Sequence, residues 1–450
     1  EGGRIANYTH LNPPSVNGYN AFTSETARRK IILDDGSSKT NPDPVIFPSP
    51  ELTAANTLRM GDTISSLSGI LDYRNSAYKV QPVGTVNFVH NNLRTAAPDA
   101  TSGTLKAASA NLLNYFNTFT QCTNGIGGIP SDDQCRGADD ATEFARQRAK
   151  IIAQLTALDA DVVGLMEIEN DGYAADSALQ DLVNGLNEAL GAGTYAFINP
   201  DLANGLNAMG SDYIRVAMIY KPATLLPLGD PAVLNTGAFV QVDDISTVGM
   251  EVRNRVPLAQ SFTEIASGEI FTVVVNHLKS KGSSCADPTT YLPAGDPDEL
   301  DGQGNCNLTR QMAAQEEAAW LAEDPTGSQD PDVLILGDLN SYAYEDPISA
   351  LTAAGYTDLL KQWVGPAAYG YVYSALYGYL DHALASPSLS GQVTGITEWH
   401  NNADEPLALD YDMTYKTTRL DALLYAPDAY RASDHDPVLI GLELNTPVTV

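Results

Sequence analysis

Several short apolar runs of this chain are bounded by acids, amides or imidazoles, and this pattern limits the fold more than any other feature. Polar residues follow the runs 162–166, 271–275 and 333–336 and precede the run 438–442. Runs of this length are typical of buried strands. A helix is expected over residues 143–158, with Thr142 as its N-cap. Alternating strands and helices predict a layered α/β or α+β domain, with the polar strand ends gathered where the loops converge.

The chain has 450 residues, which is more than one core usually accommodates, so two domains are expected. A linker rich in Pro, Ser and Gly over residues 97–103 separates a small domain, residues 1–100, from a large one, residues 104–446. The small domain has balanced charges and strand-like runs at 29–33 and 78–82. These runs, separated by turn signals, predict a small β-barrel.

Residues 1–100 carry no net charge, so the net charge of −31 lies entirely beyond residue 100. It repels nucleic acid and other polyanions unless bound cations or a local basic patch reverse the field. Glu, Asp and Asn oxygens with only a few imidazoles suit Mg²⁺ or Mn²⁺ better than zinc. The sequence lacks the motifs of P-loop hydrolases, serine hydrolases with a nucleophile elbow, and zinc proteases. Metal-assisted phosphoester chemistry is therefore the remaining interpretation.

Four cysteines lie in loop-like sequence without metal-binding spacing, so disulfides are expected rather than zinc. Three connectivities are open, and we favour the local pairs Cys122 with Cys135 and Cys285 with Cys306 because short loops cost least to close. Disulfides indicate an extracellular, secreted or periplasmic protein. With no apolar stretch of membrane-spanning length and no signal peptide, we expect a mature or trimmed chain, no membrane insertion, and a monomer.

The loop between Cys285 and Cys306 contains five acidic residues, at positions 287, 296, 298, 299 and 301. Their spacing departs from the EF-hand pattern. A structural Ca²⁺ in this loop is one interpretation. A solvated loop closed by a disulfide is the interpretation we prefer.

Six motifs resemble, in the same order, those of the endonuclease/exonuclease/phosphatase superfamily. They are Ser-Ala-Asn (109–111), Gly-Leu-Met-Glu (164–167), Asn-His (276–277), Gly-Asp-Leu-Asn (337–340), Leu-Asp-His (380–382) and Ser-Asp-His-Asp-Pro (433–437). Segments 161–170, 277–282 and 301–307 look like the bacterial secreted nucleases of that superfamily. The resemblance implies a four-layered αββα sandwich of two packed mixed sheets. In those relatives an oligonucleotide-binding (OB) barrel comes first, and segments 3–8 and 59–63 resemble one that lacks its first part.

The resemblance also implies roles for individual residues. Asn111, Glu167 and Asp434 would form the metal site, with Glu167 as the direct ligand. Asp338 would orient or deprotonate the attacking water, and Asn340 would hold the phosphate. A cation and a carboxylate that activates water are consistent with phosphodiester hydrolysis.

Two histidines complete the implied site. His435 would contact the scissile phosphate, with its ring oriented by Asp381, and His277 would supply the second imidazole. Which imidazole acts as acid and which as base stays open. Asp421 is a rival to Asp381, and we prefer Asp381 because Asp421 lies in an apolar run close to the last motif.

Two basic residues are candidates for binding the substrate. Arg215 opens an apolar run, and its guanidinium suits a phosphate. Lys279 lies beside His277 in an otherwise acidic region and could touch a flanking phosphate, although a solvated surface lysine fits the sequence equally well.

Together these features predict a secreted, divalent-metal-dependent nuclease that cuts DNA endonucleolytically with little sequence preference and leaves 5′-phosphates. RNA stays open as a second substrate. The alternative within the superfamily is a phosphodiesterase or phosphatase of lipid or sugar phosphates, similar to sphingomyelinases. The tyrosines between 369 and 379 are the nearest candidate for the apolar surface such an enzyme needs. A non-catalytic DNA-binding protein is disfavoured, because no implied catalytic side chain is missing.

Overall fold

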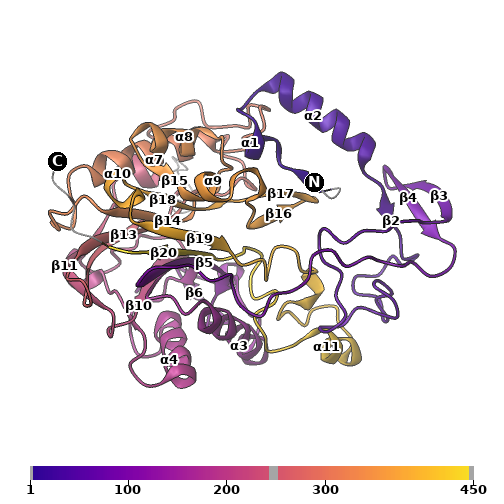
Figure 1. The fold of residues 1–450 in the computed structure, drawn as a ribbon, viewed down its shortest axis with the longest axis horizontal. Coiled ribbons are helices and arrows are strands. Elements are labelled where there is room, and N and C mark those ends of the chain that lie inside the picture. The colour runs from indigo at the N-terminus through magenta and orange to yellow at the C-terminus, as the bar shows by residue number, and fades with distance from the viewer. Residues whose placement is uncertain (1–3, 243–251, 445–450) are drawn as a thin grey trace.

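The computed structural model describes residues 4–242 and 252–444. Two six-stranded mixed sheets pack face to face at its centre, and helices cover both outer faces (Figure 1). This arrangement confirms the predicted α/β sandwich. Within the two described ranges, no helix has the length and apolar character needed to span a membrane.

The first sheet has the order β19-β20-β5-β8-β10-β9. Its central strands β5 and β8 are parallel, and every other neighbouring pair is antiparallel. The bounds are β19 (Val393–Glu398), β20 (Val438–Leu442), β5 (Leu105–Tyr115), β8 (Val162–Glu169), β10 (Ile214–Tyr220) and β9 (Ala196–Phe197).

The second sheet has the order β11-β12-β13-β14-β18-β15 and is built alike. Its one parallel pair is β13 with β14. The bounds are β11 (Leu225–Val233), β12 (Leu258–Glu264), β13 (Ile270–His277), β14 (Val333–Asp338), β18 (Asp381–Ala385) and β15 (Thr357–Asp358). Each sheet thus delivers two carboxyl strand ends side by side at its centre, which is where parallel strands place functional loops.

The two faces of β8 pack against different layers. Val163 and Leu165 belong to the core under the outer helices, whereas Met166 belongs to the core between the sheets. Gly164 also faces the second sheet, because a Cβ there would lie 2.8 Å from a methyl group of Val275. A side chain at this glycine would force the two sheets apart.

Helices α3 (Ala141–Leu158) and α4 (Ala178–Leu190) cover the first sheet. The second is covered by α7 (Asn307–Leu321), α8 (Asp346–Ala353), α9 (Leu359–Trp363) and α10 (Pro387–Ser390). Helix α3 matches the predicted helix, but its N-cap is Asp140 rather than Thr142. The Asp140 carboxylate accepts hydrogen bonds from the backbone N–H groups of Thr142 and Glu143, as an N-cap does.

The small barrel predicted for residues 1–100 is wrong. Apart from β1 (Ile5–Ala6), the described strands of residues 4–100 form one open three-stranded sheet, β2 (Ile32–Leu33), β4 (Ala77–Pro82) and β3 (Gly69–Arg74), and no barrel closes. Three strands are too few to close on themselves. Much of the preceding chain is helix α2 (Val16–Arg29), which begins at the N-cap Ser15.

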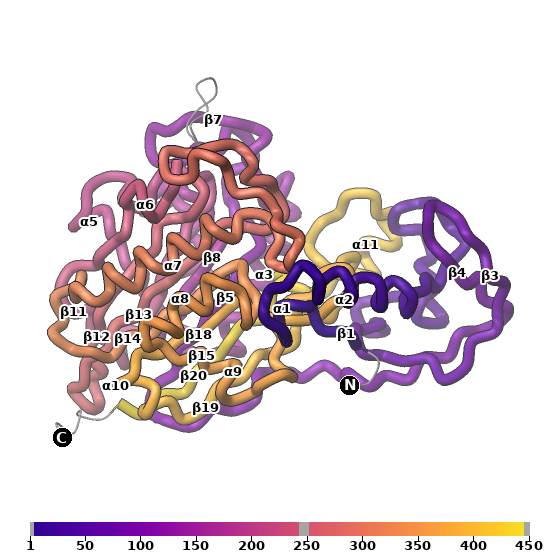
Figure 2. Tube along the Cα trace, turned by 90° about the horizontal axis from the view of Figure 1, so that it is seen from above, coloured from indigo at the N-terminus to yellow at the C-terminus, as the bar shows by residue number. Residues whose placement is uncertain are grey.

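The N-terminal residues join the sandwich through backbone pairing. Strand β1 (Ile5–Ala6), followed by α1 (Tyr8–Leu11), lies parallel to β17 (Leu376–Gly378), which pairs in turn with β16 (Tyr371–Tyr373). The sheet β2-β4-β3 and helix α2 lie at one end of the long axis in both ribbon and tube views (Figures 1 and 2). The division into domains at residue 100 stays a prediction.

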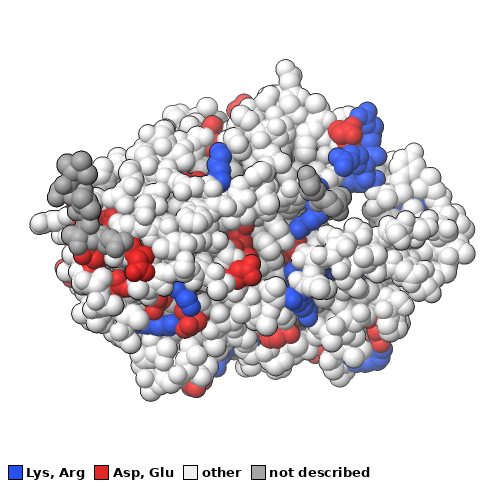
Figure 3. Space-filling view, in the orientation of Figure 1, with Lys and Arg blue, Asp and Glu red and all other residues white. Residues whose placement is uncertain are grey.

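The remaining elements are short. They are β6 (Cys122–Thr123), β7 (Pro130–Ser131), α5 (Asp201–Asn204), α6 (Gly237–Val240), α11 (Thr418–Leu424) and three 3₁₀ turns at Asp132–Gln134, Gly365–Ala367 and Leu407–Leu409. Basic side chains on the face of Figure 3 gather over the C-terminal end of α2, whose last turn contains Arg28 and Arg29.

Candidate active site

Three predicted site residues stand in one row across the second sheet. His277 ends β13, Asp338 ends β14 and Asp381 begins β18, and the strand register pairs His277 with Asp338 and Asp338 with Asp381. All three are buried. His277 Nε2 lies 3.6 Å from Asp338 Oδ2. Neighbouring strands are about 5 Å apart, so this register alone holds the three side chains together.

His435 is joined to this row through Asp381. Its Nδ1 lies 2.5 Å from Asp381 Oδ2, and its ring packs on Tyr371 with the ring centroids 4.5 Å apart. Burial alone lowers the pKa of His435, but the negative charges of Asp381 and Asp434 outweigh it and raise the pKa well above its usual value. The ring is therefore an imidazolium at neutral pH.

His277 differs from His435 in that its ring is neutral. Burial, and then the positive charges of Arg255 and His435, lower its pKa well below the usual value. Its Nδ1 is buried without a hydrogen-bond partner among the described residues. The site thus contains one charged and one neutral imidazole, which is the difference that separate acid and base roles require.

Asp338 is the carboxylate that interacts with both histidines. Its Oδ1 accepts from the Asn340 N–H at 2.8 Å, and its Oδ2 accepts from the Asn340 side-chain amide at 3.1 Å. Burial raises the pKa of Asp338 to about 7, with further raising by Asp381 and Glu167 and opposition from His435. A carboxylate that titrates near neutral pH can accept a proton from water.

The first sheet brings Asn111 and Glu167 together. The Asn111 side-chain amide donates to Glu167 Oε1 at 3.2 Å, and the Asn114 N–H donates to Glu167 Oε2 at 3.0 Å. Burial first, and then the negative charge of Asp434, raises the pKa of Glu167. Because the charge of Glu167 also acts on Asp338, the polar strand ends of the two sheets face each other.

The implied metal ligands fit a hard cation. No cluster of three or more His, Cys, Asp or Glu side chains able to hold a metal occurs in residues 4–242 and 252–444. Glu167 and Asp434 nevertheless repel each other enough to raise the Glu167 pKa, and a cation between them would relieve that repulsion. Two carboxylates with the Asn111 amide oxygen are ligands that Mg²⁺ or Mn²⁺ accepts, together with water or phosphate oxygens.

Arg215 does not point into this group. Its buried guanidinium donates to the carbonyl oxygens of Glu169, at 3.2 Å, and Gly172, at 2.6 Å, and packs over the Tyr173 ring. These contacts fix the loop that follows β8. In the structure Arg215 thus supports the loop beside the site, and its predicted contact with a phosphate stays a prediction.

Arg255, which sequence reasoning missed, lies close to the candidate site. Its Nε lies 2.9 Å from Asp212 Oδ2, and its charge acts on both His277 and Glu167. The local signal was an Arg-Asn-Arg segment, residues 253–255, just before an apolar strand. The sequence alone does not show that this segment lies near the site, because only the folded chain places it beside β13.

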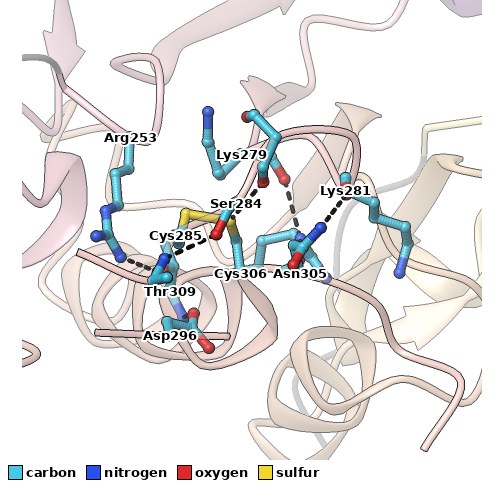
Figure 4. Close-up of a disulfide and its surroundings, with 12 residues drawn as sticks. Arg253, Lys279, Lys281, Ser284, Cys285, Asp296, Asn305, Cys306 and Thr309 are labelled. Carbon is cyan, nitrogen blue, oxygen red and sulfur yellow. Dashed lines mark hydrogen bonds between the residues drawn. A yellow bond between two sulfur atoms is a disulfide. The ribbon is translucent and has the colours of Figure 1, made fainter. Parts of the chain in front are cut away.

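Lys279 lies on the loop that leaves β13, and its charge helps to lower the pKa of His277. The predicted disulfide Cys285–Cys306 ties this loop to the start of α7, and the Lys279 and Lys281 side chains point in different directions from it (Figure 4). The second predicted disulfide, Cys122–Cys135, is also formed.

The acidic loop closed by Cys285–Cys306 shows no cation-binding cluster in its described residues. Asp296 instead accepts hydrogen bonds from the backbone N–H groups of Leu308 and Thr309 at the start of α7. Its carboxylate serves the helix N-terminus, where an acid is favourable.

A family model described as the endonuclease/exonuclease/phosphatase family matches residues 109–435. The chain belongs to this family, whose members hydrolyse phosphodiesters and phosphomonoesters and generally use divalent metals. A second model, described as a domain of unknown function, matches residues 6–91. No curated protein sequence matches the chain.

Similar solved structures include the human Nocturnin catalytic domain, at 13% identity, covering 76% of this chain and 96% of that one with a TM-score of 0.43. A mannosyl-6-phosphatase from Bacteroides thetaiotaomicron has 16% identity, 76% and 100% coverage and a TM-score of 0.44. D. rerio TDP2, solved with a single-strand DNA product, has 14% identity, 75% and 97% coverage and a TM-score of 0.42.

Proposed function

We propose that this protein is a secreted, divalent-metal-dependent nuclease that hydrolyses phosphodiester bonds of DNA with little sequence preference. Family membership supports a phosphoester hydrolase. The observation that carries the proposal is the charged His435–Asp381 pair beside Asp338, a buried carboxylate with a pKa of about 7. An acid and a base of this kind, close together, are what hydrolysis of a stable diester needs.

In the mechanism we propose, Asp338 accepts a proton from water, and the water oxygen attacks phosphorus in line with the leaving 3′-oxygen. The P–O3′ bond breaks, and His435 donates its Nε2 proton to that oxygen, so the product carries a 5′-phosphate. Asp381 keeps the His435 ring oriented and charged. His277, which is neutral, has a single N–H group and donates it to a phosphate oxygen.

Asn111, Glu167 and Asp434 would hold the divalent cation, which when bound supplies positive charge to the phosphate oxygens. Asn340 is already fixed by Asp338 and by the Leu278 carbonyl oxygen, at 3.1 Å. Its amide is thus positioned next to the proposed base. Arg255 and Lys279 add positive potential in a chain of net charge −31.

Disulfides in the structure support a location outside the reducing cytoplasm. One observation favours the alternative, a lipid phosphodiesterase. The β3–β4 hairpin exposes the apolar side chains Ile70, Leu71, Tyr73 and Tyr78, each at least 58% accessible, and exposed apolar patches can contact membranes.

Purified protein incubated with linear DNA, plasmid DNA and sphingomyelin vesicles distinguishes these functions. Mg²⁺ or Mn²⁺ should support DNA cleavage, EDTA should abolish it, and the new ends should accept label only after phosphatase treatment. His277→Ala and Glu167→Gln should each lower the rate at least about 100-fold. Intact DNA together with hydrolysed sphingomyelin would favour the alternative, and unchanged cleavage by both variants would contradict the proposed site.

A further inference from the structure

A second imidazole–carboxylate pair adjoins the first. His400 Nδ1 lies 2.9 Å from Asp436 Oδ2, and Asp436 directly follows His435, whose own partner is Asp381. The mechanism above gives His400 no role. Asp436 also accepts from the backbone N–H groups of residues 402 and 403, each at 2.8 Å, so it fixes the loop that carries His400.

Two tyrosines align the two histidines. The His400 ring stacks on Tyr369, with centroids 3.8 Å apart and planes 7° apart, and the His435 ring packs on Tyr371. Tyr369 and Tyr371 are two residues apart, with Gly370 in a bend between them, so their Cα atoms are at most about 7 Å apart. The two imidazoles therefore contact neighbouring residues, at a spacing comparable to that of successive phosphates along one nucleic-acid strand.

His400 is built to present a charge to solvent. Its side chain is 31% exposed, whereas Asp436 is fully buried. Among described residues, Nε2 has no hydrogen-bond partner. Burial lowers the His400 pKa, but Asp436 more than compensates and the net shift is upward. This direction favours the charged form of the ring, in which one N–H donor is used by the protein and one is available to a ligand.

The N-terminal residues hold this histidine in place. The Arg4 guanidinium covers the Tyr369 ring at 4.2 Å and pairs with Asp404 at 2.7 Å. Arg59 donates to the backbone carbonyl oxygen of His400 at 2.5 Å. A ring stacked on a fixed neighbour loses little further freedom when it binds a ligand, so the site is preorganised.

We propose that His400 binds the phosphate next to the scissile phosphate on the same nucleic-acid strand. The inference rests on the proposed nuclease function. His435 contacts the phosphate that reacts, and His400 contacts its neighbour. A substrate with a single phosphodiester reaches only the first histidine. His400 therefore favours polynucleotides over small diesters.

His400→Ala tests this assignment with two substrates. For an oligothymidylate, KM should rise about tenfold, the value of one hydrogen bond to a charged group at a partly exposed site, while kcat changes little. For bis(p-nitrophenyl) phosphate, both constants should stay at wild-type values. The salt dependence of binding should weaken by one phosphate contact, a change of about 0.7 in the log–log slope for a single strand.

His90→Ala is the matched control. His90 forms the same kind of pair, with Nδ1 2.9 Å from Asp62 Oδ2, and is 43% exposed, but among the described residues its ring contacts neither Tyr369 nor Tyr371. Its removal should leave both substrates unaffected. An unchanged oligonucleotide KM in His400→Ala, or equal losses on both substrates, would overturn the proposal.

Chemical change of the substrate gives an independent test with the wild-type protein. Replacing the neighbouring phosphate by an uncharged methylphosphonate should lower kcat/KM about tenfold for wild type and cause no further loss in His400→Ala. Equal losses in both proteins would refute the contact. If wild type hydrolyses only the small diester and never DNA, the proposed function fails with it, a result distinct from the others.

Discussion

Replacing Asp381 by Asn separates charge from shape in the His435 pair. Asp381 is 1% exposed and its Oδ2 lies 2.5 Å from His435 Nδ1. Asparagine has nearly the same volume but no charge. The variant should therefore fold, but His435 would lose its closest negative partner and the proton that the mechanism requires.

The magnitude follows from that one contact. A hydrogen bond between charged groups contributes about 1.5–3 kcal/mol, which corresponds to a loss of about 10- to 100-fold in kcat/KM. Asp421→Asn is the control, because Asp421 is the rival acid of the sequence analysis. It pairs with Arg146 at 2.6 Å, in a partly buried contact that includes no residue of the candidate site.

Initial rates of oligonucleotide cleavage measure both variants, and urea unfolding checks that each is folded. Asp421→Asn should retain wild-type activity. The reasoning would be refuted if Asp381→Asn kept at least half of the wild-type kcat/KM, or if both variants lost activity equally while remaining folded.

Three further predictions concern stability. Glu405→Gln should cost about 3 kcal/mol in urea unfolding, because it leaves two arginines without their buried partner; a loss under 1 kcal/mol would contradict it. Burial raises the pKa of Glu317 from 4.5 to about 7, so unfolding releases this proton and the free energy of unfolding should fall by about 3 kcal/mol between pH 4.5 and 7. Thermal melts at pH 5 and pH 8 should show a smaller loss of stability with rising pH in Glu317→Gln than in the wild type. Reducing Cys285–Cys306 should cost about 3 kcal/mol, and an unchanged melting temperature would refute that.

The strands of the sandwich and the row at their ends could be predicted because their signals are local. An apolar run followed by a polar residue identifies both the strand and the end that carries chemistry, as in 271–277 and 333–338. The two sheets then bring those ends together. His400 and Arg255 could not be found in this way, because their partners Asp436 and Asp212 are distant in sequence and only folding joins them.

The N-terminal region was mispredicted for a related reason. Helix α2 buries only Thr26 of its fourteen residues, so its sequence lacks the apolar stripe by which a helix is recognised. The structure does not bring Arg215 into the group of site residues, and the reason is different. Its guanidinium chemistry suited a phosphate, but a fully buried arginine is used to satisfy loop carbonyls, and sequence does not reveal which demand prevails.

Three arginines reach across from the first hundred residues to the loop beside the site: Arg4 pairs with Asp404, and Arg59 and Arg94 pair with Glu405. Removing the residues before about position 100 would leave Asp404 and Glu405 without these arginines. It would also remove the Arg4 guanidinium that covers the Tyr369 ring. The sandwich therefore depends on the N-terminal region. A different segment in place of the first hundred residues would have to supply equivalent cations to keep that loop in place.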